Sequence, residues 1–76
     1  MIRFSTVCID NITKGEMILA DCSFNEACMF LKRENEDNRF GKYKGTEHVT
    51  LNVCKLVFEK ATFLHDEERG CLIRKE

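Results

Sequence analysis

The chain has 76 residues, of which 43% are hydrophobic and 33% charged, and its formal net charge at pH 7 is −1. This composition predicts one small globular domain over residues 1–76, because a disordered chain combines low hydrophobicity with a large net charge. The near-neutral balance argues against a generally basic surface for nucleic acid or anionic membranes, and no apolar run approaches the ~18 residues of a membrane span.

The chain opens on an apolar, β-branched stretch, residues 2–9, that predicts a strand. By period-two alternation one face carries Ile2, Phe4, Thr6 and Cys8, and the other carries Val7 and Ile9. Turn-forming residues follow at 10–15, and an apolar run resumes at 16–22. These features together predict a β-hairpin.

A helix capping signal follows the hairpin. Ser23 and Glu26 are spaced so that each side chain can bond to the other residue's backbone N–H. Behind this cap, one helical face carries Phe24, Ala27, Cys28 and Leu31, with Phe30 beside them. We expect the helix to end near Asn35, where the sequence becomes continuously polar.

A long polar connection at residues 34–46 separates the helix from the second half of the chain. Connections of this length are uncommon in small domains and often carry function. Its segment 39–45 interleaves three cations, two aromatic rings and two glycines, a mixture that can stack on bases, anchor a protein partner, or form a turn whose rings tuck onto the core.

The second half of the chain reads as β-structure. Alternating apolar residues from position 47 predict a strand that reaches residue 58, with a bulge where the apolar phase changes near Cys54. A hairpin then joins 61–65 to 71–75 through the turn Asp66 to Gly70. Residues 53–69 also fit a second helix that ends at Gly70, but their β-prone side chains favour strands.

These elements predict an α+β fold in the order β-β-α-β-β-β, a small antiparallel sheet with one helix packed on one face. The other sheet face is expected to be solvated or paired with another molecule, because Val7, Ile9, Cys54, Leu56 and Phe58 are assigned to it. A homodimer through that face or through a sheet edge is an open alternative.

The cysteine and histidine spacing predicts no metal site, and the chain contains no nucleotide-binding motif, so no cofactor is expected. The odd count of five cysteines, mostly within apolar stretches, predicts free thiols and a cytoplasmic protein. A small thiol enzyme built on Cys71, His65 and Asp66 is the least favoured of three functional hypotheses, since so small a core leaves little room for a catalytic cleft.

Tracing the predicted strands places the loops 10–15, 34–46 and 66–70 at one end of the domain. Loops on a rigid scaffold are where binding residues concentrate, so this end is the predicted contact surface, with Phe40 and Tyr43 as anchors. The predicted binding residues are Arg39, Phe40, Lys42, Tyr43, Lys44, Asp66, Glu67 and Glu68.

The favoured function is a non-enzymatic binding protein of the accessory or inhibitor type, which acts by occupying a protein partner. A compact, motif-free chain of this kind is similar to the small accessory proteins that bacteriophages and mobile elements encode. The alternative is a nucleic-acid-binding module that uses segment 39–45.

Overall fold

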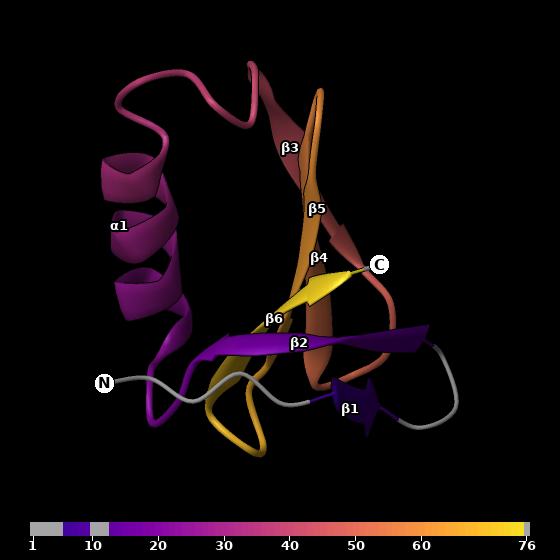
Figure 1. The fold of residues 1–76 in the computed structure, drawn as a ribbon. Helices are drawn as coiled ribbons and strands as arrows, with labels where there is room; N and C mark the ends of the chain where they lie inside the picture. Colours follow the sequence, from indigo (N-terminus) through magenta and orange to yellow (C-terminus); the bar gives the residue numbers. More distant parts are fainter. Residues whose placement is uncertain (1–5, 10–12, 76) are drawn as a thin grey trace.

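The computed structural model describes residues 6–9 and 13–75, and the side chains of residues 15–75. Its elements are β1 (Thr6–Ile9), β2 (Thr13–Leu19), α1 (Phe24–Glu34), β3 (Tyr43–His48), β4 (Val53–Phe58), β5 (Thr62–Asp66) and β6 (Cys71–Lys75). All strand pairs are antiparallel, in one sheet ordered β1-β2-β6-β5-β4-β3, and α1 lies over one face (Figure 1). The predicted α+β class is confirmed, and no described helix has the length and apolar character needed to cross a membrane.

The start of α1 is the predicted capping box. The Glu26 N–H donates to Ser23 Oγ at 3.2 Å, and the Ser23 N–H donates to Glu26 Oε1 at 3.0 Å. These bonds satisfy two backbone donors at the helix start, so the helix begins where the sequence indicated. The helix ends at Glu34 with Asn35 as its C-cap, as predicted.

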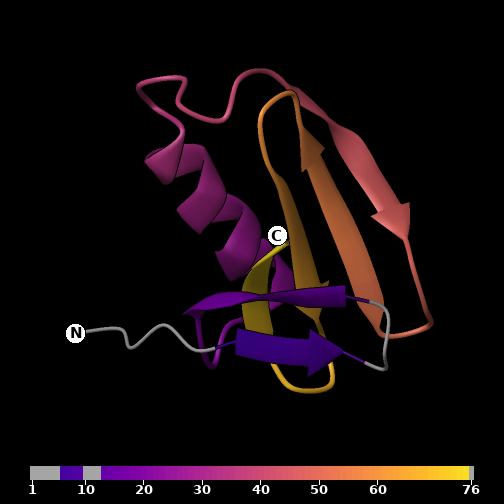
Figure 2. The same cartoon turned by 45° about the vertical axis from the view of Figure 1, so that its right-hand side comes forward.

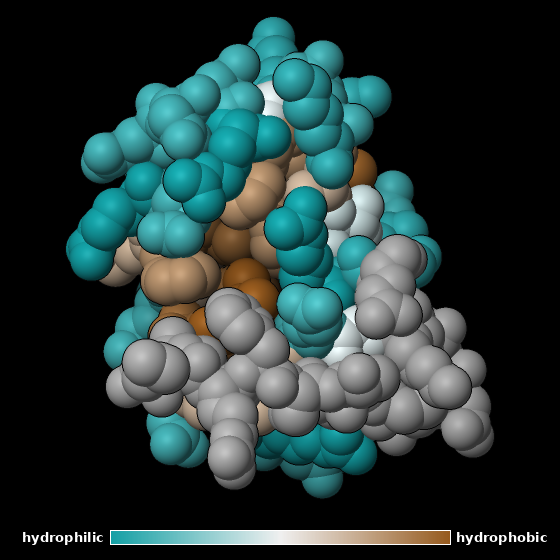
Figure 3. Space-filling model, viewed as in Figure 1, coloured by the Kyte–Doolittle hydropathy of each residue, from teal (hydrophilic) through white to brown (hydrophobic). Residues whose placement is uncertain are grey.

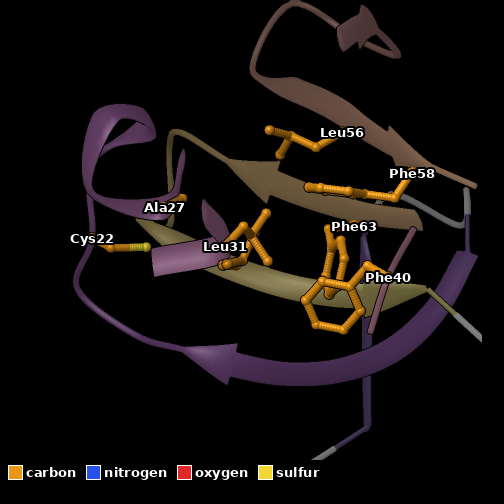
Figure 4. Close-up of a cluster of buried hydrophobic side chains, with 8 residues drawn as sticks. Cys22, Ala27, Leu31, Phe40, Leu56, Phe58 and Phe63 are labelled. Carbon is orange, nitrogen blue, oxygen red and sulfur yellow. The ribbon is translucent and has the colours of Figure 1, made fainter. Parts of the chain in front are cut away.

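The main core lies between α1 and the sheet. Ala27 and Leu31 are buried on the inner face of the helix, against Leu56, Phe63 and Leu72 of the three central strands (Figure 4). Phe24, Cys28 and Phe30 are partly buried against the same cluster. The predicted apolar face of the helix is therefore the face that packs.

A second buried cluster lies on the opposite face of the sheet, and its members are Val53, Leu64, Cys71 and Ile73, with Met17 and Val49 packed against them. The sheet is strongly coiled, because β2 runs across the direction of β4 and β5 (Figures 1 and 2). The expectation of a solvated second face that carries Cys54, Leu56 and Phe58 is wrong. Leu56 and Phe58 face the helix, whereas Val53 belongs to the other cluster.

Gly15 allows the close approach of β2 to β6, its neighbour in the sheet. A Cβ at this position would lie 2.3 Å from the Arg74 carbonyl oxygen and 2.6 Å from Ile73 Cγ2. The register between β2 and β6 also shifts between Met17 and Leu19. A bulge increases local twist, so this register shift contributes to the coil of the sheet at β2 and β6.

The stretch 47–58, predicted as one strand with a bulge, forms two strands. It contains the end of β3, a turn at residues 49–52, and β4. The Val49 N–H donates to Val53 O at 2.8 Å, and Leu51 at the tip is 92% exposed. The turn lacks glycine and proline, the usual markers of a chain reversal, so its sequence resembled continuous alternation.

The other predictions for the strands have mixed outcomes. β1 pairs with β2, which confirms the first hairpin, and β5 pairs with β6 around a turn at 67–70, which confirms the last. The alternative helix at 53–69 is wrong. The faces assigned to Ile2, Phe4, Thr6, Cys8, Val7 and Ile9 lie outside the described side chains.

Candidate functional site

The predicted cluster of three loops does not form. The loop after α1 packs on the β4–β5 turn, where the Lys60 N–H donates to Phe40 O at 2.9 Å. The turn at 67–70 lies beside the start of α1, where the Cys22 N–H donates to Gly70 O at 2.7 Å. The two therefore lie at opposite ends of the helix (Figure 1). The reversal at 49–52 adds one change of chain direction, so each later turn lies at the opposite end of the sheet from the predicted one. The predicted arrangement was wrong for this reason.

Phe40, predicted as a surface anchor, belongs to the core with only 7% of its surface exposed. Its ring centroid lies 5.0 Å from that of Phe63 and 5.7 Å from that of Phe58, both edge-on (Figure 4). The Asn35 side-chain amide fixes the loop around this ring, because it accepts the Phe40 N–H and donates to Gly41 O. Phe40 therefore offers no ring to a partner.

Arg39 already has acidic partners within its own loop. Its guanidinium donates to both Asp37 carboxylate oxygens, with Nη2 3.2 Å from Oδ2, and lies 3.9 Å from Glu34. These hydrogen bonds from Arg39 lower the pKa of Asp37. The cation is thus balanced locally, which removes one of the three positive charges that favoured a nucleic-acid contact.

The remaining predicted residues of segment 39–45, Lys42, Tyr43 and Lys44, are exposed. Tyr43 is 48% exposed, and its ring packs on Phe58 with 5.2 Å between centroids. Its hydroxyl forms a hydrogen bond with Thr46 Oγ1. Tyr43 therefore stands on the core with one side free, as a surface anchor does.

The three acidic residues of the last turn separate into two roles. Asp66 is buried, and its Oδ1 accepts the N–H groups of Glu68 and Arg69, so it holds the turn together. Glu67 and Glu68 are exposed. Of the predicted acidic contacts, Glu67 alone lines a pocket that is described below.

A groove runs between α1 and the edge strand β3, with β4 as its floor. Its upper part, about 440 Å³, is lined by Cys28, Leu31, Lys32, Asn35, Tyr43, Leu56 and Phe58. Its lower part, about 370 Å³, is lined by Phe24, Thr46, His48, Cys54, His65 and Glu67. α1, β3 and β4 contribute to both parts, and His65 of β5 and Glu67 line the lower part as well. The two neighbouring parts together are named the α1–β3 groove.

The lower part of the α1–β3 groove contains a thiol between two imidazoles. Strand register aligns His48 of β3 with Cys54 of β4, and Cys54 with His65 of β5. The Cys54 Sγ lies 3.5 Å from His48 Nδ1. His65 is buried, donates from Nε2 to Cys22 O at 3.0 Å, and packs edge-on against Phe24.

Strand β3 forms one wall of this groove and is also a free sheet edge, because β4 is its one neighbour in the described sheet. All of its residues except Gly45 are exposed. The Val49–Val53 hydrogen bond shows which positions of β3 direct their backbone groups toward β4. These positions alternate along an antiparallel pair, so Thr46 and His48 direct their backbone N–H and C=O groups away from β4.

On the opposite side of α1 a second hollow shows apolar residues between the helix and the sheet (Figure 3). It has a volume of about 380 Å³, and Phe40 and Phe63 form part of its lining. Charged residues surround it, namely Glu16, Glu34, Arg39 and Arg74. No free strand edge lies beside it, since β2 and β6 pair with each other.

The residues of the thiol-enzyme hypothesis do not form a catalytic set. Register pairs His65 with Leu72 and Asp66 with Cys71, so His65 lies on the helix side and Cys71 in the opposite cluster. Within residues 15–75, no three His, Cys, Asp or Glu side chains are arranged to hold a metal ion. The Cys–His contact that exists, between Cys54 and His48, was not among the predicted sites.

The groove residues that were not among the predicted site residues are Phe24, Cys28, Leu31, Lys32, Asn35, Thr46, His48, Cys54, Leu56 and Phe58. The available signal is the alternation of Thr46 and His48, which marks one face of a strand, but the predicted loop 34–46 includes residues 43–46.

We compared the chain with family models, curated proteins and solved structures, and none of the three comparisons found a match.

Proposed function

We propose that this protein is a cytoplasmic, non-enzymatic binding module that takes up an extended segment of a protein partner along β3. The partner segment adds as a further strand beside β3 and places alternate side chains in the α1–β3 groove. The observation that carries this proposal is a free, exposed edge strand directly beside an apolar groove. Strand addition at such an edge is a recurring mode of peptide recognition.

The backbone of β3 supports the pairing. Thr46 and His48 direct their peptide groups outward, and an incoming strand satisfies them with main-chain hydrogen bonds. These bonds supply affinity without requiring a particular sequence. Free edges are normally protected against unwanted pairing by short length and charged side chains. β3 has both features, since it is six residues long and carries Lys44 and Glu47.

The groove supports a partner with apolar and acidic side chains. Its upper part is lined by Leu31, Leu56 and Phe58, with Tyr43 as the exposed wall. Lys32 lines the same part, and Lys42 and Lys44 flank Tyr43 in the sequence, all of them exposed. The groove is therefore suited to apolar side chains at alternate positions followed by a carboxylate near these lysines.

The nucleic-acid alternative has weaker support. It relied on the cations and rings of segment 39–45 acting together, but Phe40 is buried and Arg39 is paired with Asp37. Two lysines and one ring remain, in a chain with a net charge of −1. Binding through phosphates requires a larger basic surface.

The test is capture of partners from a lysate of the source cell, with and without nuclease, by the wild type and by Thr46→Pro. Proline removes the outward N–H of Thr46 while leaving the β4 side of the ladder intact. We expect a protein captured in both lysates and roughly tenfold less of it on Thr46→Pro, as loss of a main-chain bond and its neighbours predicts. Thr46→Val, which retains the N–H, should capture as the wild type does.

Hydrogen exchange on the captured complex locates the contact. The amides of Thr46 and His48 should become protected, while those facing β4 should change little. Capture that disappears with nuclease and falls steeply with salt would indicate nucleic acid instead. Equal capture by wild type and a folded Thr46→Pro variant would place the contact elsewhere.

A further inference from the structure

The Cys54–His48 contact is a feature that strand addition does not explain. The two residues are cross-strand partners on adjacent strands, so the ladder holds thiol and imidazole at 3.5 Å. Directly opposite partners of an antiparallel pair project from the same sheet face. The juxtaposition is therefore part of the sheet, and it does not depend on a flexible loop.

This pair opens into the lower part of the α1–β3 groove. The space there, about 370 Å³, is also lined by Phe24, Thr46, His65 and Glu67. Cys54 is half-buried and His48 is exposed, and both line this space, so a small molecule that enters it lies beside the pair. The ring of Phe24 supplies an apolar wall, and Thr46 and Glu67 supply polar atoms.

The other described cysteines lack these properties. Burial raises the pKa values of Cys22, Cys28 and Cys71, and no imidazole is in contact with their thiols among the described residues. A thiol held in its protonated form is a poor nucleophile. Among the four cysteines whose side chains are described, Cys22 and Cys71 are buried, and Cys28 is half-buried as Cys54 is. Of these four, Cys54 is the one whose sulfur has an imidazole nitrogen within hydrogen-bonding distance.

We propose that Cys54 is a covalent modification site at which the thiol, with His48 as its proton acceptor, reacts with low-molecular-weight disulfides. The chemical class follows from the pocket, which accommodates a small ligand, and from the nucleophile, since thiolates attack disulfide sulfur directly. The reaction does not require a protein partner, although the site opens into the groove that strand addition would occupy.

The reaction is a thiol–disulfide exchange, which consumes one disulfide and forms another, so it needs no further oxidant or reductant. His48 Nδ1, unprotonated in the tautomer with its hydrogen on Nε2, takes the thiol proton. The Cys54 sulfur then bonds to one sulfur of the disulfide RSSR, and the original S–S bond breaks. The leaving RS⁻ takes a proton from the His48 imidazolium, so the products are Cys54–S–SR and RSH; Cys54 is oxidised and one RS group is reduced.

The groups that face Cys54 set the pH dependence of this exchange. They are His48 on β3, His65 on β5, Cys28 on α1 and Glu67 after β5. Of these, His48 has its ring nitrogen within hydrogen-bonding distance of the sulfur. Removing His48 should therefore slow the reaction near neutral pH and move the rise of the rate to higher pH.

The experiment exposes the folded protein to hydroxyethyl disulfide and follows each cysteine-containing peptide by mass spectrometry over time. We expect Cys54 to form the adduct roughly tenfold faster than Cys22, Cys28 or Cys71, and Cys54→Ser to abolish that adduct. His48→Gln should slow it by about tenfold and shift its pH–rate profile upward. Glu47→Gln, beside His48 but on the opposite sheet face, is the matched control and should leave the rate unchanged.

Two results would overturn the proposal. One is labelling of Cys54 no faster than labelling of Cys28. The other is a His48→Gln variant that has wild-type melting behaviour and an unchanged rate and pH profile. Because the readout is an adduct at a named sulfur, neither result depends on whether a partner segment binds along β3.

Discussion

Two aromatic residues three positions apart, Phe40 and Tyr43, have different roles in this protein. The loop held by Asn35 directs Phe40 into the core, where it meets Phe58 and Phe63. Tyr43 begins β3 and covers Phe58 from outside. We therefore expect Phe40 to contribute to stability, because it is buried, and Tyr43 to be available for binding, because it is half exposed.

The first prediction concerns these two rings. Phe40→Ala should destabilise the fold by about 3–5 kcal/mol, as removal of a buried phenylalanine does. Tyr43→Ala should cost about 1 kcal/mol, because half of that ring is already in water. Denaturant melts measure both. Similar losses for the two variants would mean that Phe40 is not the core residue described here.

The second prediction concerns the helix cap. Hydrogen bonds from the Ser23 backbone and side chain lower the pKa of Glu26 below its ordinary value. A carboxyl whose pKa is lower in the folded state stabilises the fold above its unfolded pKa, and this contribution is lost as pH falls through the folded pKa. Glu26→Gln should therefore flatten the loss of stability in acid. Glu36→Gln, an exposed glutamate beyond the helix, serves as the control in melts from neutral pH to about pH 3.

At the scale of elements, the close pairing of β2 with β6 holds this end of the sheet together. The pairing requires a glycine at position 15, since a Cβ there would enter the space of the Arg74 carbonyl. It also places Met17 against the second cluster, so both faces of the sheet are partly covered. The coil of the sheet leaves β3 as the far edge, where the α1–β3 groove opens.

The third prediction tests that close pairing. Gly15→Ala should destabilise the protein by about 1–3 kcal/mol, because the close neighbours include backbone atoms that cannot rotate away. Glu16→Ala, at the next and exposed position, should change the free energy of unfolding by less than about 0.5 kcal/mol. Thermal or denaturant melts of the two variants provide the comparison. Equal effects would show that the strands have room to separate.

At the scale of the molecule, the sheet runs from a protected centre to an open edge. β5 and β6 lie in the middle and carry Phe63, Leu64, Leu72 and Ile73, all essentially inaccessible to solvent. β3 has exposed residues along its length and one neighbour. Local stability should follow this gradient, because backbone bonds with few buried neighbours open most easily.

The fourth prediction is the pattern of native-state hydrogen exchange. The slowest amides should belong to Leu64 and Ile73, which pair across the centre of the sheet. The amides of Thr46 and His48 should exchange at nearly unprotected rates, because their N–H groups point away from β4. Strong protection at these two positions in the isolated protein would mean that the edge is already paired, for example with a second copy of the chain.

The sequence alone determined the parts of this protein that depend on near neighbours. A capping box needs two residues three positions apart, so Ser23 and Glu26 located the start of α1. The β-prone residues around 61–65 and the turn-forming stretch that ends at Gly70 likewise identified the last hairpin. The class of fold follows from such local features.

Only the tertiary structure decided where the candidate site lies. The direction of each strand depends on the number of preceding reversals, and one turn without glycine or proline, at 49–52, moved the acidic turn to the opposite end from Tyr43. Whether Phe40 lies inside depends on Phe58 and Phe63, which are distant in sequence. The α1–β3 groove joins residues from Phe24 to Glu67, so its existence depends on long-range packing that no local pattern encodes.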